Sequence, residues 1–466
     1  MSVARLAGFF FILLWSLPCL AANHDSSVVV IRSFRIIGNK KTKEHIILRE
    51  MGFGLNDAIQ IESLAEMLTQ AQKNLMNTSL FNFVSVNYVH EEVNQIDVVV
   101  NVIERWYLWP SLIFEVADRN FNVWWRARDW TRVNYGFTLT KYNMRGRRET
   151  LQLTARLGTW QQYRLAYNLP FIGKNLKTGL YVSYSYLRNR EVGYRSFNNE
   201  LLFYNNATDY VRQEQVGRVK LTFRKKVFNT HSLEGRFTSS WVDDTLKVIG
   251  PGYFSGNKSS TGFFSLHYTF VSDHRDIKAY PLKGHLLGAD ISQFGLGVLS
   301  EESSGFLRAE LELRYYHTIS KKWFAGFWAK TRLASSYLQP YYLQRGLGYG
   351  NDYVRGFEYY VVDGQQTFLT KLFIKYQLMA PKTLEMGFGG DRFGKTHHAF
   401  YLNFFVDGGY VSDQLYTKDN PLANRALGGI GLGLDYVTYY DRVFRVEAAL
   451  NSKNEPGVFF HYGIPF

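Results

Sequence analysis

Beyond residue 107 the chain consists of short segments in which apolar and polar residues alternate, and this pattern limits its possible folds more than any other feature. In segment 150–158 every second residue is apolar: Leu151, Leu153, Ala155 and Leu157. A period of two places these side chains on one face of a β-strand. After residue 22 there is no run of the roughly 18 apolar residues that a membrane-spanning helix needs. Because backbone groups in lipid must be hydrogen-bonded internally, we predict a mostly β fold, an antiparallel transmembrane β-barrel over residues 108–466.

Composition agrees with a barrel. Aromatic residues make up 17% of the chain, charged residues 20%, and there are 39 glycines. Disordered chains have few aromatic residues and collagen has a strict glycine period, so both classes are excluded. The barrel region has room for about sixteen strands if each spans about 9–11 residues. Further alternating segments are 180–186, 216–223, 262–270, 306–316 and 443–450.

An even number of strands places both ends of the barrel on the same side of the membrane. On that side we expect short turns, such as 228–231 and 320–322. On the opposite side we expect long loops, such as 191–213 and 337–364. This asymmetry of short and long connections is typical of outer-membrane barrels.

The first residues form a segment separate from this fold. A positive residue, an apolar run over 7–15 and small residues at 21 and 22 predict a secretory signal peptide over residues 1–22. A membrane-anchoring helix and a lipoprotein attached through Cys19 are the alternatives. Cys19 is the only cysteine, so removal of residues 1–22 leaves a chain without disulfides, thiol nucleophiles or cysteine metal sites.

Residues 23–107 form a different kind of unit. A β-branched run at 28–37 predicts a strand, and 42–50 and 59–76 predict helices, the second with apolar residues at three- and four-residue spacing. Two more strands are expected at 83–90 and 95–104. The order β-α-α-β-β predicts a small α/β domain with a core of its own.

Charge also divides the chain: residues 23–107 carry a net charge of −2, and residues 108–466 carry +15. The basic excess is scattered over polar and loop positions, which suits a hydrated lumen or contact with anionic lipid headgroups and not a nucleic-acid interface. We found no nucleotide-binding, hydrolase or metalloprotease motif, and no spacing singles out a histidine. We therefore expect no enzyme activity, no catalytic residue, no metal and no cofactor. The glycine-rich stretches 346–350 and 428–433 fit close backbone approach or bending of the barrel.

Two short motifs follow one another along the chain, the first in a predicted loop and the second in a predicted strand. Val354, Arg355, Gly356 and Phe357 lie in the predicted long loop, and Phe405, Asp407 and Gly409 follow in an alternating segment. In this order they resemble the VRG(F/Y) and FxDxG pair of the BamA/TamA superfamily of outer-membrane assembly and secretion barrels, the bacterial surface antigen family. Residues 36–42, 79–84 and 98–104 resemble a single POTRA domain of that family, and 273–284 resembles its inner turn.

The resemblance implies that Arg355 pairs with Asp407 and tethers the loop inside the lumen. A guanidinium and a carboxylate can form such a two-bond pair, which fixes geometry more than it adds stability. The alternative is an ordinary solvated arginine on a surface loop.

The C-terminal segment places Val458, Phe460, Tyr462, Ile464 and Phe466 on one strand face, and it resembles the signal by which barrel proteins are themselves assembled. In the family this last strand closes against the first, here near residues 108–116, and the seam is thought to open to receive client strands. Gly463 and a nearby proline would weaken the pairing, either as part of a gate or as a plain strand end. The strand at 83–90 could accept a client by β-augmentation, or the domain could dock accessory proteins.

Together these features predict an ATP-independent factor of the bacterial outer membrane that inserts or translocates polypeptides, with its N-terminal domain in the periplasm. The expected partners are unfolded outer-membrane or secreted polypeptides, membrane lipids, and accessory periplasmic proteins or lipoproteins. The alternatives are a dedicated secretion pore for one partner protein and a passive outer-membrane channel. A lipid hydrolase built on a barrel is a further class, which an esterase assay would test.

Overall fold

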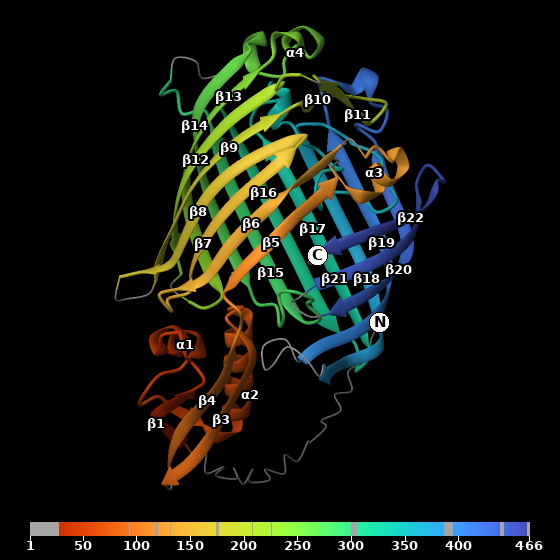
Figure 1. The fold of residues 1–466 in the computed structure, drawn as a ribbon. Helices are drawn as coiled ribbons and strands as arrows, with labels where there is room; N and C mark the ends of the chain where they lie inside the picture. Colours follow the sequence, from red (N-terminus) through yellow and green to blue (C-terminus); the bar gives the residue numbers. More distant parts are fainter. Residues whose placement is uncertain are drawn as a thin grey trace, which may run out of the picture.

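A computed structural model describes residues 28–463 of the protein, apart from 93, 117–119, 131, 174–176, 207, 225, 300–304, 386–394 and 439–441. The predicted signal peptide, Ile464 and Phe466 lie outside the described residues. Figure 1 shows a small domain below one end of a large barrel. Within the described ranges, no helix combines the length and apolarity needed to cross a bilayer.

The N-terminal domain is a four-stranded sheet with two helices, in the sheet order β2-β1-β4-β3. Strands β1 and β4 are parallel, and β3 stands at one edge. We predicted the order β-α-α-β-β and missed β2, because three residues are too few to show a period of two. The elements are β1 (Val28–Ile37), α1 (Glu44–Met51), β2 (Ala58–Gln60), α2 (Ile61–Asn77), β3 (Phe81–Glu92) and β4 (Gln95–Glu104).

Helix α2 contributes one apolar stripe to this domain's core. Leu64, Leu68, Ala71 and Leu75 recur at three- and four-residue spacing and are all buried against the sheet. This spacing places them on one stripe of the helix, so that burial of the stripe stabilises the short sheet. Phe171 of the barrel joins the same apolar cluster, and the domain core therefore continues into the barrel.

The barrel is an antiparallel sheet of sixteen strands, as predicted. Neighbours in the chain pair along the whole sheet, except that β9 pairs with β12 across an inserted hairpin. The strands are β5 (Leu108–Val116), β6 (Val133–Met144), β7 (Glu149–Gly158), β8 (Trp160–Ile172), β9 (Thr178–Asn189), β12 (Arg212–Phe223), β13 (Asn229–Val242), β14 (Ser260–Asp273), β15 (Gly284–Phe294), β16 (Phe306–Thr318), β17 (Trp323–Ala334), β18 (Gln366–Glu385), β19 (Lys395–Ser412), β20 (Ala426–Thr438), β21 (Arg442–Asn451) and β22 (Pro456–Gly463).

Strand β21 shows why the sequence forms this wall. Its residues alternate strictly between exposed and buried, with Phe444 and Val446 facing outward and Arg445 and Glu447 facing the interior. Apolar side chains can therefore contact lipid while charged side chains line the lumen, the arrangement expected of a membrane barrel.

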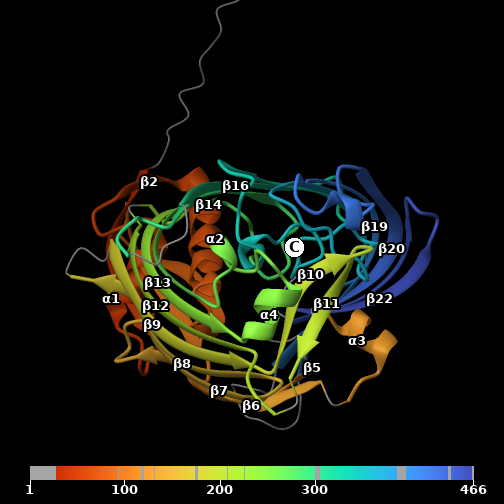
Figure 2. The ribbon, with the colours of Figure 1, turned by 90° about the horizontal axis from the view of Figure 1, so that it is seen from above.

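The two ends of the barrel differ. The end near the N-terminal domain carries short turns, and the other end carries long insertions (Figure 1). Seen from above, α4 and the β10–β11 hairpin lie over the barrel interior (Figure 2). The inserted elements are α3 (Phe121–Ala127), β10 (Glu191–Phe197), β11 (Glu200–Asn205), α4 (Asp244–Ile249), and short 3-10 turns at Ser255–Asn257, Tyr341–Leu343 and Thr417–Asp419.

The first and last strands stand at the two ends of the hydrogen-bonded order. We expected 458–466 to pair with the strand near 108–116, but in the part of the chain that is described β22 pairs only with β21 and β5 only with β6. The edge of β5 is correspondingly open: Leu112 is 91% exposed, whereas the outward Val446 of β21 is 42% exposed. Pro110 within β5 has no N–H to donate, which suits a strand at a sheet edge.

Candidate functional site

The loop between β17 and β18 folds into the lumen and packs on the barrel wall. Val354 and Phe357 of the loop are buried in an apolar cluster with Val411 of β19 and Leu427 of β20. A turn closed by the Phe357 N–H and the Val354 carbonyl places Arg355 at its tip, toward the wall. The predicted motif residues 354–357 thus lie side by side against β19 and β20.

Arg355 pairs with Asp407 through one edge of its guanidinium, formed by Nε and Nη2. Nε donates to Asp407 Oδ2 at 2.8 Å and Nη2 to Oδ1 at 2.6 Å, and the backbone N–H of Arg355 donates to Oδ2 at 3.1 Å. Nη1 donates to Glu447 Oε1 at 3.2 Å, and the guanidinium carbon lies 3.7 Å from the centre of the Phe405 ring. The Arg355 side chain is 2% exposed, so this network is dry. Its geometry is the two-bond, aromatic-stacked arrangement for which arginine is suited and lysine is not.

Glycines let the loop approach the wall this closely. A Cβ atom on Gly429 would lie 1.9 Å from the Arg355 carbonyl oxygen, and one on Gly409 would lie 2.5 Å from Val354 Cγ2. The contact at Gly429 is with the backbone, so that position requires glycine, whereas a Cβ at position 409 would force the buried Val354 side chain to shift. The final glycine of the second motif and the glycine-rich stretch 428–433 therefore serve close backbone approach.

The charges continue along the inner wall beyond the predicted pair. Arg445 Nε lies 3.7 Å from Glu447 Oε1 and donates to Asp435 Oδ1 at 2.6 Å. Asp435 accepts a hydrogen bond of 2.7 Å from the hydroxyl of Tyr280 and lies 3.9 Å from Lys375 Nζ. Tyr280 comes from the turn 274–283, the segment that resembles the family's inner turn. Buried charges thus alternate from the turn near the N-terminal domain to the loop motif.

Sequence reasoning missed Glu447, Arg445 and Asp435 as site residues. The available signal was their position on the polar phase of otherwise apolar strands, at residues 435, 445 and 447. That signal could not distinguish a hydrated lumen from a dry network, because the covering loop is distant in sequence.

Glu358, Glu447 and His461 each offer one metal-ligand atom, and these three atoms lie within 4.8 Å of one another. His461 Nε2 lies 3.3 Å from Glu447 Oε2 and 3.6 Å from Glu358 Oε1. Glu447 is already paired with Arg355, and this positive neighbour disfavours a metal cation. The group instead links the inner loop, through Glu358, to the last strand, through His461.

The predicted seam residues lie on the outer face of β22. Val458, Phe460 and Tyr462 are exposed to 57%, 52% and 63%, and Gly463 ends the strand. Between them, Phe459 points inward, is 1% exposed and packs on Tyr359 of the inner loop, with ring centres 5.4 Å apart. The loop therefore supports the last strand from inside.

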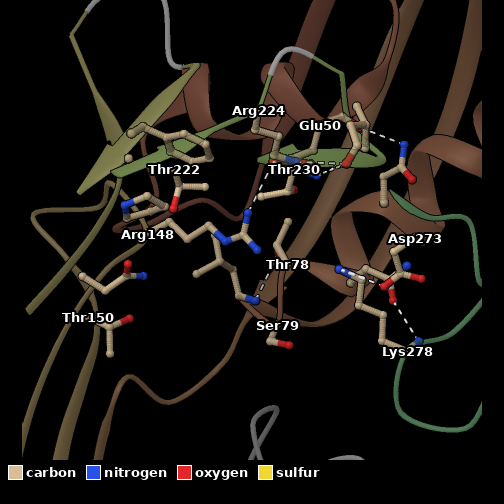
Figure 3. A pocket seen from close by; sticks show the side chains of 18 of the residues that line it. Glu50, Thr78, Ser79, Arg148, Thr150, Thr222, Arg224, Thr230, Asp273 and Lys278 are labelled. Carbon is tan, nitrogen blue, oxygen red and sulfur yellow. Dashed lines mark hydrogen bonds and ion pairs between the residues drawn. The ribbon is translucent and has the colours of Figure 1, made fainter. Parts of the chain in front are cut away.

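A second charged cluster joins the N-terminal domain to the barrel turns, beside a cavity of about 460 Å³ (Figure 3). Glu50 at the end of α1 is 1% exposed and accepts hydrogen bonds from Arg224 at 2.9 Å and Arg148 at 3.4 Å. Burial lowers the pKa of Arg148, and the charge of Glu50 offsets this only in part. The sequence contains no local signal for this contact, because Glu50 and Arg224 are 174 positions apart in the chain.

Two family models match the sequence. "Surface antigen variable number repeat" (POTRA) matches residues 29–105, and "Omp85 superfamily domain" matches residues 143–438. A search of curated proteins returned no match.

Solved structures show the same fold. BamA from Haemophilus ducreyi lacking POTRA domains 1–3 is 16% identical with a TM-score of 0.54, over 93% of this chain and 84% of that one. CdiB from Escherichia coli is 11% identical with a TM-score of 0.55, over 96% and 92% of the two chains. CdiB from Acinetobacter baumannii is 13% identical with a TM-score of 0.51, over 94% and 73%.

Proposed function

Because the chain belongs to the Omp85 superfamily, we propose that it inserts or translocates other polypeptides at the bacterial outer membrane. It does so without ATP and without covalent catalysis. The free energy comes from the client, whose apolar strand faces leave water for lipid.

The proposal assigns each part of the chain a place. Residues 1–22 direct export and are removed, residues 23–107 lie in the periplasm, and residues 108–466 span the outer membrane. The support for this orientation is the position of the N-terminal domain at the end of the barrel with short turns (Figure 1). In outer-membrane barrels the short turns face the periplasm.

The outer edges of β5 and β22, with which no second strand of the described chain pairs, carry the proposal. A backbone N–H or C=O that faces lipid without a partner costs several kcal/mol, on the order of a lost hydrogen bond or more. An extended client segment that pairs with such an edge satisfies these groups whatever its side chains are. Sequence-tolerant templating of client strands at the seam follows from this.

Capture begins at the N-terminal domain in this scheme. Strand β3 stands at the edge of its sheet, with Val89 exposed to 49%, and could add an extended client segment by β-augmentation. Docking of accessory periplasmic proteins or lipoproteins would use the same edge. Lipids and anionic headgroups contact the outer face of the basic barrel.

The inner loop then acts as a brace. Arg355 and Asp407 fix the loop to β19, and Tyr359 and Glu358 of the same loop contact β22 from inside. The last strand is therefore held in place from the lumen although no strand among the described residues pairs with its outer edge.

A dedicated secretion pore would use the lumen instead of the seam. The loop, α4 and the β10–β11 hairpin occupy or cover that lumen, which opposes a passive open channel and requires a secretion pore to move them (Figure 2).

The test is the folding rate of an unrelated, urea-unfolded outer-membrane barrel in three kinds of liposome: empty, with this protein, and with its Arg355→Ala variant. We expect acceleration by the protein and loss of the acceleration in the variant. If the protein gives no acceleration, the insertion proposal fails, and conductance measured with candidate partner proteins would then test the secretion pore.

A further inference from the structure

Helix α3, in the first outer loop, lies between β5 and β22 (Figures 1 and 2). Trp124 of the helix is buried, and its ring stands edge-on to Trp130 with centres 4.8 Å apart. The Asn120 side chain caps the helix by accepting a hydrogen bond from the Val123 N–H at 2.9 Å. The helix is thus an ordered element placed beside the open seam.

Asn122 of α3 makes both hydrogen bonds that a neighbouring strand would make. The N–H of Phe460 in β22 donates to Asn122 Oδ1 at 2.9 Å, and Asn122 Nδ2 donates to the Phe460 carbonyl at 3.3 Å. One residue that exchanges both bonds with one partner is the hydrogen-bonded pair of an antiparallel ladder. The side-chain amide of Asn122, itself 4% exposed, therefore takes the place of a backbone at the edge of β22.

The position of Phe460 makes this contact central. Along an antiparallel strand, the direction of the backbone groups alternates with the same period of two as the side chains. Val458 and Tyr462, which share the outward face with Phe460, therefore present their N–H and C=O groups to the same free edge. Asn122 occupies the middle of these three positions.

The inner loop holds α3 against β22. Asn120 Nδ2 donates to the Glu358 carbonyl at 3.0 Å, and the Arg126 guanidinium lies 5.4 Å from the Tyr359 ring centre. Tyr359 also packs on Phe459 of β22. Helix, loop and last strand therefore form one contact, adjacent to the Arg355 motif.

We propose that α3 is a latch on the seam, and that an incoming polypeptide strand must displace Asn122 to pair with β22. The inference rests on the proposed function and adds its regulation. The displacing segment must be extended, and the residue opposite Phe460 must both donate and accept a backbone hydrogen bond. Proline, which lacks the N–H, is excluded at that position.

The test compares amide hydrogen exchange in β22 of the full-length protein in liposomes, for the wild type, Asn122→Ala and the control Asn205→Ala. Asn205 is an exposed residue at the end of β11 in a different outer loop. We expect exchange in the peptide containing Phe460 to rise about tenfold in Asn122→Ala, because two hydrogen bonds are lost, and to stay unchanged in the control. Unchanged exchange in Asn122→Ala would overturn the latch.

A second variant covers the possibility that Asn122→Ala does not fold, which altered electrophoretic mobility on heating would reveal. Asn122→Asp keeps the acceptor for the Phe460 N–H and removes the donor to its carbonyl, so we expect exchange between the values of the wild type and Asn122→Ala. Exchange equal to the wild type in this variant as well would contradict the inference.

The wild type, Asn122→Ala and Asn205→Ala are then assayed for their effect on the folding rate of a urea-unfolded client barrel. A faster reaction with Asn122→Ala than with the wild type supports displacement of the latch by the client strand, and an equal reaction contradicts that step. If none of the three accelerates folding, the proposed function fails, whereas the exchange result still decides whether Asn122 protects the edge.

Discussion

The wall strands β18 to β21 and the edge strands β5 and β22 differ in how their backbone hydrogen-bonding groups are paired. Each wall strand is paired on both sides. The inner loop covers the inner face of this wall, where Arg355 of the loop pairs with Asp407 of β19 and Glu447 of β21. Each edge strand has one neighbour, and at β22 a single asparagine takes the place of the second. Buried charge therefore fixes a wall directly beside a strand edge that no second strand of the described chain covers.

The largest effect is expected from removal of one partner of the dry pair. Asp407→Ala leaves the Arg355 cation buried beside Glu447 alone, which costs roughly 3–5 kcal/mol in the free energy of unfolding. Urea unfolding in detergent micelles measures it. The matched control is Asp419→Ala, whose partner Arg195 is 38% exposed and for which we expect a change below about 1 kcal/mol. Equal effects of the two substitutions would remove the distinction between dry brace and surface pair.

A smaller effect is expected from a methyl group placed between loop and wall. Gly429→Ala brings Cβ to 1.9 Å from the Arg355 carbonyl and should detach the loop or cost about 1–3 kcal/mol. Protease cleavage within the loop, compared with the wild type, reports detachment. Gly217→Ala in β12 is the control, since a Cβ there meets nothing within 4 Å. Cleavage unchanged in Gly429→Ala would show that the loop is not seated through this contact.

A substitution at the junction of the two domains tests whether the buried ion pairs there hold the N-terminal domain in a fixed position relative to the barrel. Glu50→Gln weakens the bonds to Arg148 and Arg224. We therefore expect the free energy of contact between the two domains to fall by about 2 kcal/mol. The distribution of distances between the N-terminal domain and the barrel should then broaden. Spin-label distance measurements give the distribution. Glu66→Gln on the exposed face of α2 should leave it unchanged. A distribution as narrow as that of the wild type would show that apolar contacts alone hold the domain.

The smallest effect concerns an ion pair that water can reach. Arg32 donates two hydrogen bonds of 3.0 Å to Asp97 and, with a side chain 41% exposed, lowers the pKa of Asp97 to about 2. In the unfolded chain the pKa of Asp is about 3.9. A lowered pKa stabilises the folded domain above pH 4, and this contribution is lost as the pH falls toward 2.

Urea midpoints of the N-terminal domain in the full chain, measured at pH 5 and pH 2.5, should therefore fall more for the wild type than for Asp97→Asn. Equal falls would mean that Asp97 does not contribute to the acid sensitivity of the domain.

The sequence predicted what local pattern encodes. The period of two in segments such as 443–450 gave the sixteen strands, and the three- and four-residue spacing of 61–77 gave α2. Short motifs indicated which loop and which strand to compare, and the structure places Arg355 and Asp407 in contact there.

Contacts between distant segments had no such signal. Asn122 and Phe460 are 338 positions apart, and an asparagine in a seven-residue helix of an outer loop has no pattern that points to a strand edge. The lack of pairing between β5 and β22 in the described part of the chain is likewise a property of the whole sheet, because each strand alone alternates like any other. Three-dimensional placement, not residue type, decides these features.

The most direct test of the account is to lock the seam. Leu112→Cys in β5 and Phe460→Cys in β22 place two outward, exposed side chains on the two edges, which a reducible cross-linker can join. We predict that the cross-linked protein loses its acceleration of client folding and that reduction restores it in the same sample. Full acceleration by the locked protein would contradict the claim that clients are templated on the free edges of β5 and β22.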